Sequence, residues 1–157
     1  MLWADVEMNY LNKIKAMRFK LFLLVLIVGS ILSCSTTHNS TGVEKALGNY
    51  DQLIQRMDAQ AISMLFTPDG HLGDMASGRD SIRIFLSSFK NVQVLAQNST
   101  SDSIKMIEDT AFQNGSYHQT DIINGKDTLH VQGTYSATWV WIKGNGWLLK
   151  NIRTQSL

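Results

Sequence analysis

The chain has 157 residues, of which 44% are hydrophobic, and its formal net charge is +1. This length suits one domain with a single buried core. Because the charge is close to zero and no basic stripe is present, nucleic acid is not expected as a partner. A lone cysteine, Cys34, cannot form an internal disulfide, so the core must hold the fold together.

The first part of the chain has the pattern of a secretory signal. Arg18 and Lys20 precede an apolar stretch over residues 21–32, and a small residue follows. A membrane-spanning helix needs ~20 residues, so a permanent transmembrane anchor is the weaker interpretation. We predict a signal peptide that ends at Ser33, with Met17 as the true initiator.

The segment Ile31-Leu32-Ser33-Cys34 resembles the lipobox of bacterial lipoproteins, although Leu32 is bulkier than usual at its position. The resemblance implies that Cys34 is lipidated, becomes the first mature residue and holds the protein on a membrane of the bacterial cell envelope. The alternative is an ordinary signal peptide with an incidental cysteine. Residues 34–41 are then the lipidated cysteine and a polar tether in which His38 is inert, and residues 42–157 form the domain.

Three helices are predicted after the tether. Thr41 and Glu44 have the spacing of a capping box, and apolar residues then recur every three or four positions up to Met57, with Tyr50 on that face. Asp58 is expected to cap a second, shorter helix, which a Pro68-Asp69-Gly70 turn follows. The third helix carries apolar residues at helical spacing: Ile82, Phe85, Leu86 and Phe89.

The period changes to two after Asn91, which predicts strands. Two long strands, residues 111–123 and 129–142, are joined by Asn124-Gly125, a strong hairpin signal, and residues 147–153 close the sheet. Helices followed by an antiparallel meander indicate an α+β domain. The sheet should curl around the three helices, because one sheet face must bury all their apolar stripes.

The faces of the two long strands follow from alternation. The odd residues of 129–142, with Tyr135 and Trp139 among them, form the predicted core face. A two-residue turn pairs Ile123 with Lys126 and places the even residues of 111–123, with His118 among them, on that same inner face. A three-residue loop would reverse this assignment.

Several loose motifs occur in a consistent order: Asp58-x-x-Ala61-x-x-x-x-Phe66-x-x-Asp69-Gly70, then Gly78-Arg79-x-x-Ile82-x-x-Phe85, and finally Tyr135-x-Ala137-x-Trp139 with Gly146-Trp147. Over residues 43–154 the chain therefore resembles the nuclear transport factor 2-like superfamily, in its SnoaL-like and ketosteroid-isomerase-like branch. The resemblance implies a cystatin-like cone, a strongly curved antiparallel sheet with helices closing one side, around an apolar pocket. Members include isomerases, cyclases, dehydratases and non-catalytic binders, and often form homodimers.

The resemblance also implies site residues. Tyr50 stands eight residues before Asp58, where the isomerases have a tyrosine, and Asp74 stands sixteen residues after it, where they have an aspartate base. The isomerases also need a neutral carboxylic acid on the inner face of a late strand, near Ala137 and Trp139 here, and no acid is present. Losing one oxyanion donor removes roughly 3 kcal/mol of transition-state stabilisation, so a full isomerase is not expected.

Three functions remain open on the sequence. The first is a non-catalytic domain that binds a small apolar molecule, the second a proton-transfer enzyme with Asp74 as base, and the third a dimeric accessory protein. Asp74, Tyr50 and His118 are the candidate catalytic residues. No cofactor is expected, and no metal either, because the four histidines lack ligand spacing. The candidate ligand-binding residues are Tyr50, Phe66, Asp74, His118, Tyr135 and Trp139.

Overall fold

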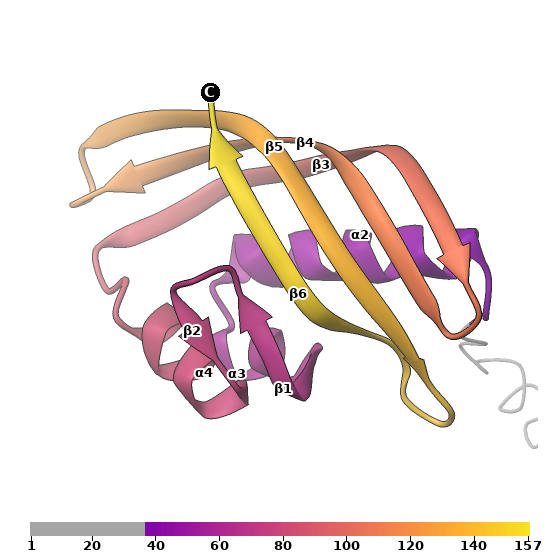
Figure 1. Ribbon diagram of the computed structural model, residues 1–157. Helices are drawn as coiled ribbons and strands as arrows, with labels where there is room; N and C mark the ends of the chain where they lie inside the picture. Colours follow the sequence, from indigo (N-terminus) through magenta and orange to yellow (C-terminus); the bar gives the residue numbers. More distant parts are fainter. Residues whose placement is uncertain (1–36) are drawn as a thin grey trace, which may run out of the picture. The chain divides into compact units, whose positions relative to one another are not determined.

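The computed structural model describes residues 37–157 (Figure 1). The predicted signal peptide and Cys34 lie outside the described residues. Three helices precede the main part of the sheet: α2 (Ser40–Arg56), α3 (Ala59–Met64) and α4 (Arg79–Ser87). The strands of the described range are β1 (Phe66–Leu72), β2 (Ala76–Ser77), β3 (Val92–Ile107), β4 (Thr110–Ile123), β5 (Asp127–Ile142) and β6 (Gly146–Ser156).

The strands form one sheet in the order β2-β1-β6-β5-β4-β3. Strands β3 to β6 are an antiparallel meander, and β1 pairs with β6 in parallel, which the sequence did not predict. The long strands curl over α2, which crosses beneath them (Figure 1). The predicted α+β cone is therefore confirmed, with α3 and α4 beside its shorter strands.

Helix α2 begins before the predicted position. Asn39, not Thr41, is the N-cap, and its side-chain Oδ1 accepts a hydrogen bond of 2.9 Å from the Gly42 N–H. The residues before the helix are also held in place, because Trp147 Nε1 donates to the Thr37 carbonyl at 3.1 Å. Thr37 and Asn39, which lie in the stretch expected to be a tether, therefore make contacts with the domain.

Two glycines of α2 provide a test of this contact. A Cβ on Gly42 would lie 1.8 Å from the Thr37 carbonyl oxygen, whereas a Cβ on Gly48 would meet nothing within 4 Å. We expect Gly42→Ala to displace Thr37 from Trp147 and to lower the free energy of unfolding. Gly48→Ala should raise it by about 0.5–1 kcal/mol, because alanine favours the helix. Denaturant unfolding measures both, and equal effects would contradict the contact.

Residues 68–70 were expected to form a turn, and this prediction is wrong. Pro68, Asp69 and Gly70 lie inside β1. The register of β1 against β6 shifts between Phe66 and His71, so Pro68 occupies an irregular part of the strand, where a missing N–H breaks no regular ladder bond.

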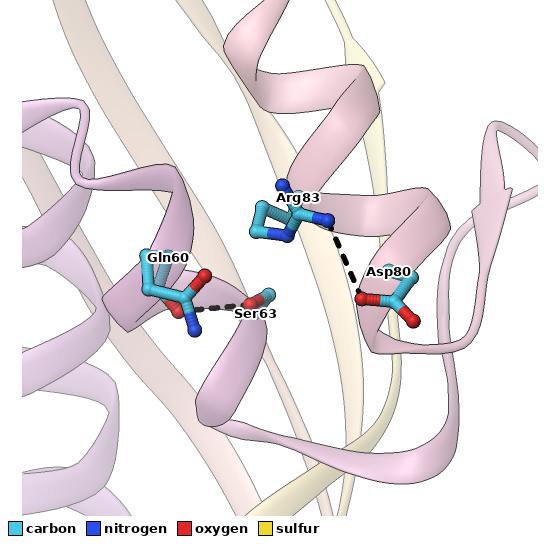
Figure 2. Close-up of polar contacts among 4 residues, drawn as sticks. All are labelled: Gln60, Ser63, Asp80 and Arg83. Atoms are coloured by element: carbon cyan, nitrogen blue, oxygen red, sulfur yellow. Dashed lines mark hydrogen bonds and ion pairs between the residues drawn. The ribbon is translucent and has the colours of Figure 1, made fainter.

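Local polar contacts complete α3 and α4. Asp58 caps α3 as predicted, since its Oδ1 accepts a 2.9 Å hydrogen bond from the Ala61 N–H. Figure 2 shows Ser63 Oγ donating to the Gln60 carbonyl at 2.8 Å and Arg83 facing Asp80 at 3.5 Å. The Arg83–Asp80 pair is exposed and adds little stability, so packing of the two helices relies on their buried apolar residues.

The faces of β4 are opposite to those predicted. Ile123 pairs with Asp127, because Lys126 joins the hairpin loop, and Gln113 consequently pairs with Ala137. The odd residues of β4 point inward, whereas the even ones, including His118, point outward. A one-residue change of register moves a whole strand's side chains to the other face. The odd residues of β5 point inward, as predicted.

Two glycine–tyrosine pairs shape the inner face. Gly115 on β4 pairs with Tyr135 on β5, and Tyr117 on β4 pairs with Gly133 on β5. A Cβ on Gly115 would lie 2.7 Å from the Tyr135 hydroxyl oxygen, and one on Gly133 would lie 2.9 Å from the Tyr117 ring. Each tyrosine therefore lies across the glycine of the neighbouring strand, which holds both rings flat against the curved sheet.

The core is apolar toward the end of the cone where the β3–β4 and β5–β6 turns lie. Trp139 and Phe66 are fully buried and belong to one core cluster. Phe85 lies on the apolar face predicted for the third helix, but it is only partly buried and packs on the rim of the cluster, edge-on to Phe89 with ring centroids 5.2 Å apart. The buried residues of α4 are Ile82 and Leu86.

Candidate functional site

A small cavity lies between α2 and the inner face of the sheet. Its volume is about 80 Å³. Helix α2 and strands β3 to β6 all contribute to its wall. The lining residues are Tyr50, Ile54, Gln97, Ser99, Tyr117, Gln119, Tyr135, Ile152 and Thr154. Seven of these nine side chains carry a polar group, while their ring and aliphatic carbon atoms form most of the surface that faces the cavity, so its wall is amphipathic.

Two lining side chains present unused polar atoms. The Tyr135 hydroxyl and Gln97 Oε1 are buried and make no hydrogen bond of good geometry among residues 37–157, although the Ser101 side chain lies close enough to the Tyr135 hydroxyl to lower its pKa in part. Tyr135 is 5% exposed and Gln97 is 8% exposed. Leaving such a group unpaired costs ~1–3 kcal/mol, and natural structures rarely tolerate it without a water or ligand. The cavity therefore offers a hydroxyl donor and an amide acceptor.

A buried carboxylate orders one wall of the cavity. Asp51, on α2, accepts hydrogen bonds from the Ser99 N–H and the Ser99 hydroxyl, both at 2.8 Å, and from Gln97 Nε2 at 3.2 Å. Each Asp51 oxygen is used, and Asp51 does not line the cavity. Asp51 therefore fixes the side chains of Gln97 and Ser99. The side-chain oxygen of Gln97, Oε1, is not used by these hydrogen bonds.

The tyrosines near this carboxylate stay protonated. Burial raises the pKa of Tyr135 to about 12; the nearby Ser101 side chain opposes this shift, and the Asp51 charge adds a smaller rise. Burial also raises the pKa of Tyr50 far above its ordinary value, and Asp51 adds to the effect. A hydroxyl that keeps its proton can donate to a carbonyl or carboxylate oxygen, so both tyrosines are hydrogen-bond donors and not bases at neutral pH.

Asp74 does not lie at this cavity. It sits in the turn between β1 and β2, its side chain is 87% exposed, and its Oδ1 accepts a 2.8 Å bond from Arg153 Nη2. Ile152 is buried, so the next residue, Arg153, points to the outer side of β6, and Asp74 pairs with it there. Tyr50 and Asp74, the two residues that the resemblance to the isomerases singles out, are therefore not brought together at this cavity.

The other predicted site residues lie in three places: at the cavity, in the core and on the outer face of the sheet. Tyr50 and Tyr135 line the cavity. Phe66 and Trp139 are fully buried in the core and do not reach it. His118 is exposed on the outer face of β4, because the register differs from the predicted one.

Near Ala137 and Trp139, the side-chain partner that the structure shows for Trp139 is an amide and not an acid. Ala137 is 4% exposed on the inner face, and Trp139 Nε1 donates to Gln113 Oε1 at 2.8 Å. Among the described residues that line the cavity, none carries a carboxylate or an imidazole. The polar groups on this wall are therefore hydroxyls and amides, which donate and accept hydrogen bonds.

Sequence reasoning missed most of the polar wall. Gln97, Ser99 and Ser101 recur at a period of two within a stretch that is polar on both faces, so alternation of apolar residues does not reveal their inner face. Tyr117 was assigned to the outer face by the error in the hairpin register. A tyrosine facing a glycine on the paired strand was the signal that would have corrected it.

Several solved structures have a similar fold. One similar structure is a ketosteroid isomerase-like protein from Erwinia carotovora atroseptica, with a TM-score of 0.63, 19% identity, and coverage of 73% of this chain and 92% of that one. A second is a candidate scytalone dehydratase from Novosphingobium aromaticivorans, with a TM-score of 0.63, 16% identity, and coverage of 73% of this chain and 81% of that one. A third is ActVI-ORFA from Streptomyces coelicolor, with a TM-score of 0.61, 15% identity, and coverage of 73% of this chain and 93% of that one. The sequence matches no protein-family model and no curated protein.

Two further observations concern the described part of the chain alone. No helix within residues 37–157 is long and apolar enough to cross a membrane. The same residues contain no group of three or more histidine, cysteine, aspartate or glutamate side chains placed to hold a metal ion.

Proposed function

We propose that this chain, which has the nuclear transport factor 2-like cone fold of ketosteroid isomerase-like and SnoaL-like proteins, is a membrane-tethered domain that binds a small polar molecule without transforming it. The observation that carries the proposal is the pair of unpartnered buried atoms at the cavity, the Tyr135 hydroxyl and Gln97 Oε1. A ligand that accepts from the first and donates to the second would satisfy both.

The size of the cavity limits the ligand. An apolar cavity of about 150 Å³ holds benzene, and a liquid water takes up about 30 Å³. The 80 Å³ found here suits a molecule smaller than benzene or a few waters. Ile54 and Ile152 supply the apolar part of the wall. We infer a compact molecule with a carbonyl or carboxyl oxygen, a hydroxyl or amino group, and a short carbon skeleton.

Binding without catalysis fits the side chains available. A proton-transfer enzyme needs a base within hydrogen-bond reach of its substrate. Asp74 is exposed and paired with Arg153, and Asp51 is saturated by three hydrogen bonds behind the wall. The tyrosine hydroxyls donate, and with no acid near Ala137 to assist them, they can hold an oxygen in place but cannot complete an isomerase site.

Membrane tethering is the second part of the proposal. It is supported by the Arg18 to Cys34 pattern, with lipid on Cys34, and its location is the bacterial cell envelope. Two signals are usually needed for a stable lipid anchor, and the several acyl chains of a lipoprotein cysteine meet that need. Cys34→Ser should release the protein into the soluble fraction or leave the precursor uncleaved.

The ligand proposal is tested by Tyr135→Phe. This change removes the unpaired hydroxyl with almost no change of shape, so the free energy of unfolding should stay the same or rise by up to ~1 kcal/mol. A small molecule retained by the protein from its own host, and seen by native mass spectrometry, should be lost from the variant. The combination of unchanged stability and lost binding separates a binding role from a structural one.

Tyr117→Phe is the matched control. Tyr117 lines the same cavity, but its hydroxyl already contacts Ser156 Oγ at 3.4 Å. This variant should keep the ligand and lose a little stability. If the wild-type protein carries only water, or if both variants retain the same ligand, the proposed binding role of the Tyr135 hydroxyl is wrong.

A further inference from the structure

We propose that one end of the domain lies in the membrane interface, with Ile107 and Ile142 inserted at the level of the lipid headgroups. This end, called the tether end below, consists of the β3–β4 turn (residues 107–110) and the β5–β6 turn (residues 142–146). The inference rests on the proposed attachment of Cys34 to a membrane, and it adds the orientation and the contacting surface, which attachment by itself does not specify.

The two turns belong to the same end of the sheet. Trp141 donates its backbone N–H to the Asp109 carbonyl at 2.7 Å, and Thr110 pairs with Val140 on β5. Both hairpins and the start of α2 lie together at one side of the molecule (Figure 1). The hairpin between β4 and β5 is at the opposite end of the long strands.

The chain enters the domain at this end and is fixed there. His38 stacks on Trp141 with ring centroids 4.8 Å apart and rings inclined by 16°, and it lies 5.4 Å from the Trp147 ring. His38 Nε2 is 3.1 Å from Asp109 Oδ1. Together with the bond from Trp147 Nε1 to the Thr37 carbonyl, these contacts attach Thr37 and His38 to the tether end.

Covalent geometry then limits how far this end can be from the membrane. Consecutive Cα atoms are 3.8 Å apart, so the three peptide links from Cys34 to Thr37 span at most ~11 Å. A lipid on Cys34 therefore holds the tether end against the bilayer surface. A free tether from Cys34 to residue 41 would let the domain move farther from the bilayer and rotate more widely than a chain that is fixed at Thr37 and His38.

The side chains at this end suit the interface. Ile107 is 49% exposed and Ile142 is 39% exposed, and Phe112 follows on the same outer face with 41% exposure. Lys105 and Lys143 are exposed beside them, and Glu108 is exposed at the tip of the β3–β4 turn. The mixed charge gives no strong preference for anionic lipid, so apolar insertion and the short chain, more than electrostatic attraction, carry the contact.

A single-site probe tests the inference on the mature, lipidated full chain. Cys34 has no free thiol once lipidated, so Ile107→Cys introduces one reactive thiol for a bimane label. The matched control is Leu95→Cys, which is 52% exposed on the same strand, twelve residues or roughly 40 Å along β3. Both proteins are reconstituted into vesicles of phosphatidylethanolamine and phosphatidylglycerol that contain brominated lipid.

We expect the label at position 107 to shift its emission to the blue and to be quenched by the brominated lipid, and the label at position 95 to stay in water. Ile142→Cys should behave like Ile107→Cys. If the proteins float with the vesicles but the label at position 107 remains exposed to water, membrane attachment is supported and the proposed orientation is wrong. If the proteins do not float, both fail. Shielding of position 107 without vesicles, together with a dimer in native mass spectrometry, would assign this surface to a second copy.

Discussion

Replacing Trp139 with alanine is expected to lower the free energy of unfolding by ~3–5 kcal/mol, the usual range for removing a large, fully buried aromatic side chain. Trp139 is completely buried on β5, where it pairs with Ala111 on β4 and Leu149 on β6. The change also leaves Gln113, which is 1% exposed, without the indole N–H that its Oε1 accepts. Denaturant unfolding followed by far-ultraviolet circular dichroism measures the loss.

Two further variants separate the causes of that loss. Trp139→Phe keeps much of the packing but leaves Gln113 Oε1 unpaired, so about 1–3 kcal/mol should be lost. Phe85→Ala removes a side chain that packs on the rim of the same core, and the loss should be smaller than for Trp139→Ala. A larger loss for Phe85→Ala would mean that the core is centred on α4 and not on β5.

Replacing Asp51 with alanine is expected to lower the free energy of unfolding by ~2–5 kcal/mol, because up to three donors lose their acceptor inside the protein. These donors are the Ser99 N–H, the Ser99 hydroxyl and Gln97 Nε2. Gln97 and Ser99 line the cavity, so the variant should also lose any bound molecule. Thermal unfolding and native mass spectrometry report the two effects separately.

Asp74 is the matched control for Asp51. Its side chain is 87% exposed and makes one exposed ion pair with Arg153, so Asp74→Ala should change stability by less than ~1 kcal/mol. Ligand retention should not change. If Asp74→Ala abolished binding or Asp51→Ala changed nothing, the assignment of the polar wall to Asp51 and not to Asp74 would be wrong.

Much of the fold could be predicted because its signals are local. The spacing of Leu47, Tyr50 and Leu53 predicts the buried face of α2, and the structure confirms it. Successive residues of β5 alternate between core and solvent, so the inward position of Tyr135 and Trp139 was also predictable. Each of these inferences needs only the period of one element.

The candidate site could be predicted only in part, because it depends on pairing between elements. Tyr50 and Tyr135 were found from their own helix and strand. Tyr117 was missed because Lys126 joins the β4–β5 loop, and one residue of loop length decides which face of β4 is buried. The buried Asp51 was missed because a charged residue on an apolar face is explained only by partners 46 and 48 residues away.

The sequence by itself determined the α+β class, the order of helices and strands, and the apolar core, since these depend on patterns that repeat within each element. Only the tertiary structure decided the chemistry of the site. It turned Asp74 outward to Arg153, placed polar groups of α2 and of strands β3 to β6 around one small cavity, and fixed Thr37 and His38 against Trp147 and Trp141. Each of these results requires a register or a long-range contact, and a short-range pattern carries no information about which distant residue supplies the partner.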